Sequence, residues 1–262
     1  RSPHGHDFAS FYYANRVAGQ GDNPYELQNL LVAVAEDGAP RAVHPYLYPP
    51  PFLITLAWTD ALSLEAAYHV WFWCDELLLL LTLAVLIRWW TRPESELRFL
   101  LILAAACMAA AVLNHVKGQM NMLVMATAFG GLWAQRSGRD GLGGTLLATA
   151  CVFKMSPALF VLWWMVERRW RAVGFVALAG AAWFSVSILA FGWDLHVHFL
   201  AEVLPQFSSG EYNGLAVKIS DLVNAAPASL FDTLFPNDGR GLSGTARLLT
   251  TAFGLSAISW TA

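Results

Sequence analysis

Residues 66–87 read AAYHVWFWCDELLLLLTLAVLI. As an α-helix this stretch would be about 33 Å long, because each residue adds about 1.5 Å. A helix needs roughly 20 apolar residues to cross the hydrocarbon core of a bilayer. The two acids in the stretch, Asp75 and Glu76, are expected to face protein or water, because an acid facing lipid is costly. The stretch therefore predicts a transmembrane helix.

The composition of the whole chain also indicates lipid as the solvent. Of its 262 residues 56% are hydrophobic and only 13% are charged, whereas soluble domains carry about 25% charged residues. The net charge of −3 is too small for a nucleic-acid-binding protein. Cys74, Cys107 and Cys151 lie singly in apolar runs, so we expect no disulfide framework and no cysteine metal site.

Arginines between the apolar runs predict the orientation. The further apolar runs are 97–114, 119–134, 141–153, 157–166, 172–191 and one that begins near Thr245. Arginines lie in three short connections, 88–98, 136–139 and 168–171. Short arginine-rich loops stay cytoplasmic. Each stretch between them is then a hairpin, with one turn at 115–119 and another at 154–157.

The alternative for the second hairpin is one helix over 141–166, about 39 Å long. It would place Lys154 at mid-membrane, where a cation costs roughly 2.5–3.5 kcal/mol. It would also export the arginines of 168–171. We therefore expect the hairpin, whose short arms leave a protein-lined recess on the outer side.

This topology predicts a single all-α, polytopic membrane domain. Residues 1–65 and 192–245 are extracytoplasmic, residues 66–191 form the transmembrane helices and short hairpins, and residues 246–262 begin a further span. The chain starts with Arg1 and stops inside an apolar run. We therefore expect the domain to continue beyond both ends.

Two polar positions are candidates for chemistry, each with a structural alternative. Asp7 precedes an aromatic run and is either a helix N-cap or a catalytic carboxylate. Lys154 is either a snorkelling lysine or a cation that receives a phosphate.

The first hairpin turn carries a second polar cluster. It consists of His115, Lys117, Gln119 and Asn121. Turn formation, and helix capping by Gln119, are the structural alternatives. Both turns place a lysine in an otherwise apolar region, and ionisable groups at membrane depth are functional candidates.

Other polar patterns are less specific. The acids of 75–76 suit either a buried structural partner or an ion pathway. The histidine pairs of 4–6 and 196–198 have a metal-binding spacing, but neither has a convincing third ligand, so we expect no metal. The glycines of GRDGLGGT (138–145) do not follow a strand, so they indicate close helix packing rather than a nucleotide loop.

The order of four motifs resembles glycosyltransferase family 87. The motifs are DFASFYYANRVAGQGDNPY, YLYPPPF, KGQMNMLV and CVFKMSPALFVLWWMVERRWR, and they extend from about residue 7 to residue 191. The later segment EYNGLAVKISDL resembles the family only loosely. The resemblance implies a bacterial polyprenyl-phosphate-mannose-dependent mannosyltransferase, a hexosyltransferase with the C-type membrane glycosyltransferase fold.

The resemblance also implies roles for the candidate residues. Asp7 would be the general base of an inverting transfer, with Asp22 in the same loop as the alternative. Lys154 would bind the donor phosphate, together with His115 and Lys117. The side chains implied to bind the sugar or the acceptor are Gln119, Asn121, Tyr46 and Tyr48.

The implied partners are a polyprenyl-phosphate-sugar donor, a glycolipid or glycan acceptor and membrane lipid, with no cofactor, metal or nucleic acid. The expected location is the inner membrane, with the active site on its extracytoplasmic face. A secondary transporter or flippase that uses Asp75 and Glu76 is the alternative function, but the two halves of the chain show no internal symmetry of the kind common in transporters. A non-catalytic scaffold that binds lipid-linked sugars is a further alternative.

Overall fold

The computed structural model describes residues 5–38, 43–90, 114, 116–209, 211–212, 215–216, 227–237 and 242–261. Its described elements are helices, apart from one short antiparallel pair formed by β1 (Glu211–Tyr212) and β2 (Leu215–Ala216). The expected all-α class is confirmed.

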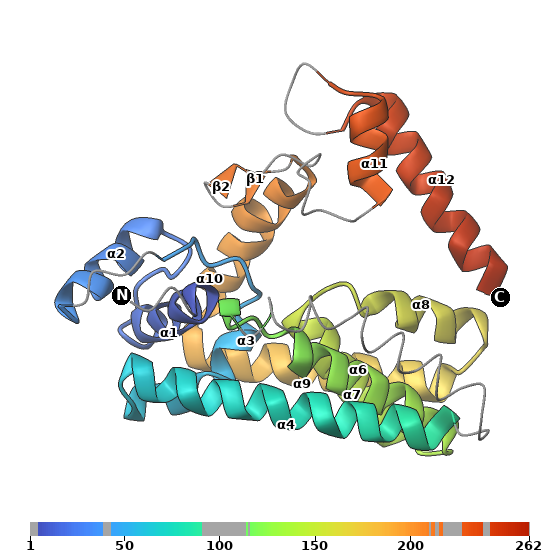
Figure 1. Cartoon of the computed structure of the whole chain (residues 1–262), viewed down its shortest axis with the longest axis horizontal. Helices are drawn as coiled ribbons and strands as arrows, with labels where there is room; N and C mark the ends of the chain where they lie inside the picture. Colours follow the sequence, from blue (N-terminus) through green and yellow to red (C-terminus); the bar gives the residue numbers. More distant parts are fainter. Residues whose placement is uncertain are drawn as a thin grey trace.

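A bundle of long helices forms the body of the molecule (Figure 1). Its members are α4 (Leu64–Trp90), α6 (Asn121–Arg136), α7 (Asp140–Phe153), α8 (Ala158–Val166) and α9 (Trp170–Phe191). Helix α7 packs between α6 and α9, and α4 packs on α6. Each apolar run that lies in the described part of the chain thus forms a helix close to its predicted bounds, whereas residues 97–113 lie outside it.

Glycines let α7 approach both of its neighbours. A Cβ added to Gly143 would lie 2.9 Å from the carbonyl oxygen of Gly131 on α6. A Cβ added to Gly144 would lie 2.6 Å from the carbonyl oxygen of Ala172 on α9. Such distances exclude a side chain at either position. The predicted packing role is confirmed for Gly143 and Gly144, whereas a Cβ at Gly138 would meet nothing within 4 Å.

The helix break predicted for the second hairpin is present. Helix α7 ends at Phe153, Lys154 has an extended backbone (φ −147°, ψ 129°), and α8 begins at Ala158. Residues 141–166 are therefore two helices, and the single-helix alternative is wrong.

Two of the described helices are long and apolar enough to cross a membrane, over Leu64–Ala84 and Trp170–Phe191. Both expose apolar side chains on the molecular surface. Trp73 of α4 is 68% exposed and Leu189 of α9 is 87% exposed. A soluble protein would bury most of these side chains, so their exposure is consistent with lipid contact.

Residues 5–38 and 43–62 form a helical unit, which we call the cap. The cap contains α1 (His6–Gly19), α2 (Leu27–Glu36), α3 (Pro51–Ile54) and the 3₁₀ turn η1 (Ala57–Ala61). It lies at the end of the bundle where α4 and α6 begin and α7 and α9 end (Figure 1). The arginines of 136–139 and 168–171 lie at the opposite end, which we call the arginine end.

Beyond α9 the chain turns at Gly192 and continues beside the cap. It forms α10 (Trp193–His198), the π-helix η2 (Phe199–Val203) and the 3₁₀ helix η3 (Leu204–Ser209). The ring of Tyr25 in the cap packs on the rings of His198 and Phe199. Two further helices, α11 (Pro227–Leu234) and α12 (Gly244–Thr261), pack on each other.

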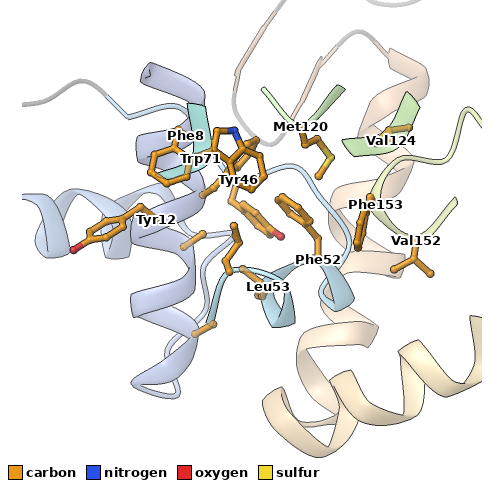
Figure 2. Close-up of a cluster of buried hydrophobic side chains, with 14 of the residues drawn as sticks. Phe8, Tyr12, Tyr46, Phe52, Leu53, Trp71, Met120, Val124, Val152 and Phe153 are labelled. Atoms are coloured by element: carbon orange, nitrogen blue, oxygen red, sulfur yellow. The ribbon is translucent and has the colours of Figure 1, made fainter. Parts of the chain in front are cut away.

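Aromatic side chains join the cap to the bundle in one buried core (Figure 2). Phe8 of α1 packs on Trp71 of α4, with ring centroids 5.4 Å apart. Phe52 of α3 packs on Phe153 at the end of α7, at 5.6 Å. Since such residues bury most of the apolar area of a core, the cap and the bundle ends are held in a fixed relation.

Candidate active site

Four polar side chains form a continuous chain of hydrogen bonds where the cap meets the bundle. The Gln119 amide donates from Nε2 to Oδ2 of Asp7 at 2.7 Å. The Asn121 amide donates from Nδ2 to Oε1 of Gln119 at 2.7 Å. The Lys154 ammonium donates from Nζ to Oδ1 of Asn121 at 2.8 Å. We call these four residues the polar relay, and all four were candidates from the sequence.

The aromatic core fixes the backbone of the relay. Phe8 follows Asp7, Met120 separates the two amide residues, and Phe153 precedes Lys154. Each of these three apolar side chains is buried in the core shown in Figure 2. The polar neighbours are half-buried at its edge, so the packing of the core places them close together.

A tight turn brings Gln119 to the start of α1. Gly118 adopts a positive φ of 70°, which glycine tolerates and other residues rarely adopt. A Cβ at Gly118 would lie 2.7 Å from Cβ of Phe8. The Gly5 amide donates to the carbonyl of Val116 at 2.7 Å. The turn therefore contacts α1 through its backbone, and a side chain at residue 118 would push Gln119 away from Asp7.

The helix-capping role considered for Asp7 and for Gln119 is wrong. Gly5 is the N-cap residue of α1 and Met120 is that of α6, and neither helix has a side-chain capping bond. The side chains of Asp7 and Gln119 bond to each other instead.

The half-buried relay has a carboxylate at one end, Asp7, and an ammonium at the other, Lys154. Burial lowers the pKa of the Lys154 ammonium, and the negative charge of Asp7 acts in the opposite direction. Burial raises the pKa of the Tyr48 phenol, and Asp7 raises it further. Helix α6 begins at Asn121 beside the ammonium, and a helix N-terminus favours an anion. An anion at this point would meet a cation and a favourable dipole together.

Two further predicted site residues, Tyr46 and Lys117, take no part in the hydrogen bonds of the relay, and a third lies outside the described part. Tyr46 is only 1% exposed and packs against Tyr25 and Tyr48 in the core. Lys117 is exposed. His115 lies outside the described residues.

Asp22 is separated from the relay by the whole of α1. That helix has 14 residues and is therefore about 21 Å long, with Asp7 in its first turn and Asp22 beyond its last. Asp22 lines a different cavity of about 400 Å³, together with Asp194 and His198. Another cavity, of about 440 Å³, lies at the same end of α1 around Arg16.

Sequence reasoning did not single out Asn114, which joins the turn that carries Gln119 to helix α4. Its amide donates to Oδ2 of the buried Asp75 at 3.0 Å. Its backbone carbonyl accepts from the amides of Gly118 and Gln119 at 2.8 and 3.0 Å. The acid of α4 therefore faces protein, as expected, and it anchors the turn that carries Gln119. The only signal in the sequence was a polar residue at the end of an apolar run.

His196 of α10 has a structural role. His196 is buried, with Nδ1 2.8 Å from the carbonyl oxygen of Gly192 and Nε2 2.9 Å from Oγ of Ser187. It therefore holds the corner between α9 and α10. Among the described residues there is no group of three or more potential metal ligands.

The family model of glycosyltransferase family 87 matches residues 46–262, which is most of the chain. The chain belongs to glycosyltransferase family 87. It is therefore a glycosyltransferase of a membrane-associated family, as its motifs suggested. No curated protein and no solved structure matches it.

Three relay residues of this family 87 protein lie within the matched range, whereas Asp7 precedes it. The case for Asp7 therefore rests on the hydrogen bond that joins it to Gln119. The match also includes the segment after residue 205, where the resemblance in the sequence was loose.

Proposed function

We propose that this protein is an inverting glycosyltransferase that transfers a sugar, mannose by family default, from a polyprenyl phosphate to an acceptor hydroxyl. The observation that carries the proposal is the polar relay, which holds a carboxylate and an ammonium three hydrogen bonds apart. An inverting transfer needs a base on one side of the anomeric carbon and a cation on the other, where the phosphate leaves.

Asp7 is the base in this proposal. Its Oδ2 is bonded to Gln119, and its Oδ1 makes no hydrogen bond with the described residues. Oδ1 takes the proton of the acceptor hydroxyl while that oxygen forms a bond to the anomeric carbon. The bond from that carbon to the phosphate oxygen breaks, and the phosphate keeps the electron pair. Attack from the opposite face inverts the configuration.

Lys154 stabilises the leaving phosphate. A fixed cation in a partly buried site acts strongly on charge that develops in the transition state. The N-terminus of α6 adds its dipole at the same point. We assign a supporting role at the phosphate to His115 and Lys117, because both belong to the turn at 115–119 that precedes α6.

An apolar stripe beside Lys154 supports a lipid-linked donor. Met155, Leu159 and Leu162 are 46%, 60% and 47% exposed. The two leucines lie about one turn apart on α8, and Met155 directly follows the phosphate-binding lysine. A polyprenyl tail would cover this stripe while its phosphate reaches the ammonium.

The arginine end supports an extracytoplasmic site. Exposed arginines cluster at the end of the bundle opposite the cap, and short basic loops stay cytoplasmic. The relay and the cap would then lie on the outer side, where the lipid-linked donor is used.

The orientation predicts which cysteines can be labelled from outside. In a variant with alanine at all three native cysteines, Gln28→Cys places a thiol on exposed α2 and Ser137→Cys places one at the arginine end. A membrane-impermeant maleimide should label Gln28→Cys in intact spheroplasts, and Ser137→Cys only after permeabilisation. The reverse pattern would contradict an extracytoplasmic active site.

The donor class is tested with membranes that contain the protein. We expect transfer of radiolabel from polyprenyl-phosphate-mannose and none from GDP-mannose, because the described residues present a single phosphate-binding lysine in the relay and no metal cluster. Polyprenyl-phosphate-glucose in parallel tests the sugar. Transfer from GDP-mannose alone would overturn the proposed donor. No transfer from any donor would favour the transporter or flippase alternative.

A further inference from the structure

We propose that Gln119 and Asn121 are positioning residues, which hold the catalytic carboxylate in place through the polar relay. This inference rests on the proposed function, because it assumes that Asp7 is the base. It departs from the expectation that the two amides bind the sugar or the acceptor.

The two ends of the relay fix its direction. The Lys154 ammonium can only donate hydrogen bonds, so the oxygen of Asn121 must face it. The Asp7 carboxylate can only accept, so the amide nitrogen of Gln119 must face it. The bond in the middle then runs from the Asn121 nitrogen to the Gln119 oxygen, as observed. Flipping either amide would bring two donors or two acceptors together.

This direction gives the carboxylate a defined orientation. Gln119 occupies Oδ2 of Asp7, and Oδ1 makes no hydrogen bond with the described residues. The amide therefore holds one carboxylate oxygen in place, while the other oxygen faces the acceptor hydroxyl in the proposed reaction. Asn121 fixes the rotation of the Gln119 amide, and its own rotation is fixed by Lys154. The cation that receives the phosphate therefore also orients the base, without touching it.

The charged and titratable groups around Asp7 come from several elements. Lys154 follows α7 and interacts favourably with the carboxylate. Tyr48 lies in the segment before α3 and also senses the carboxylate charge. Tyr68 of α4 packs on Phe8, next to Asp7. A tyrosine phenol is neutral at pH 7 even at its ordinary pKa of about 10, and burial raises the pKa of Tyr48 further. Among these described groups, Lys154 is therefore the one that carries a charge.

The test is Gln119→Glu, which keeps the shape of the side chain and places a second carboxylate beside Asp7. Two adjacent carboxylates cannot both ionise readily, so the pair holds a proton to higher pH. While the two carboxylates share a proton, Asp7 is a poor acceptor for the proton of the acceptor hydroxyl. The acidic limb of the pH–rate profile should therefore move to higher pH by at least about one unit. A residue with a purely structural role would leave the limb in place.

Gln119→Met separates positioning from sugar binding. Methionine fills similar space and makes no hydrogen bond of this kind. If the amide positions the base, kcat should fall by up to about 100-fold while KM for the donor stays close to the wild-type value. If the amide binds the sugar or the acceptor, KM should rise instead. Tm measurements identify any variant that has lost stability.

The outcomes distinguish this inference from the proposed function. The inference fails if the wild type transfers sugar, Asp7→Asn is inactive and Gln119→Glu has a wild-type pH profile. A raised KM in Gln119→Met, with unchanged kcat, also overturns it. If the wild type transfers no sugar from a polyprenyl phosphate, the proposed function fails first.

Discussion

Replacement of Asp7 by asparagine is expected to lower kcat for sugar transfer by about 10²–10⁴-fold, the range that general bases contribute. The asparagine oxygen can still accept the hydrogen bond from Gln119, which is 2.7 Å long in the wild type. The fold and the relay should therefore survive, and only the ability to take a proton is lost. The measurement is transfer of radiolabel from polyprenyl-phosphate-mannose, with a Tm for each variant.

Asp22→Asn is the matched control for Asp7→Asn. Both aspartates belong to the cap, but Asp22 lies at the far end of α1 and lines a separate cavity. We expect Asp22→Asn to transfer at the wild-type rate. Activity retained in Asp7→Asn and lost in Asp22→Asn would reverse the assignment of the base.

The second large effect is expected at Lys154. Lys154→Met removes the cation at the leaving phosphate and should lower kcat/KM by about 10²–10³-fold. The fall should appear in kcat as well, because the phosphate gains charge in the transition state. Lys117→Met should have a smaller effect, since Lys117 is exposed and water and salt screen its charge.

The pH dependence provides a second measurement on the same lysine. The ammonium must be protonated to act, and burial lowers its pKa below the usual lysine value. Activity should therefore fall as the pH rises through this lowered pKa. Lys154→Arg keeps a charge that does not titrate in this range, so a variant that retains activity should lack this basic limb. An unchanged basic limb in Lys154→Arg would exclude Lys154 as its source.

Much of the fold was predictable because its signals are local. The apolar run of 66–87 is long enough to specify a helix by its own composition, and α4 covers it. Lys154 and Pro157 interrupt the run of 141–166, and the helices end and begin on either side of them. Backbone preference and the cost of a cation in lipid act within a few residues, so a sequence carries them directly.

The site was only partly predictable because its contacts are not local. Asp7 had two interpretations, and the sequence left both open. Its partner Gln119 is 112 residues away along the chain, and only the folded helix α1 shows that Asp7 does not cap it. Asn114 received no role, since its partner Asp75 lies 39 residues earlier. The resemblance implied that Tyr46 binds the sugar or the acceptor, and the structure buries its side chain in the core.

The sequence by itself determined the helical class of this protein, its membrane-associated family and the residue types available for chemistry. Hydrophobic length and motif order supply these properties, because each depends on residues that are consecutive in the sequence. Only the tertiary structure decided which polar groups meet. Packing of Phe8, Met120 and Phe153 in one core brings their polar neighbours into a single hydrogen-bonded chain, and that packing depends on contacts between distant segments.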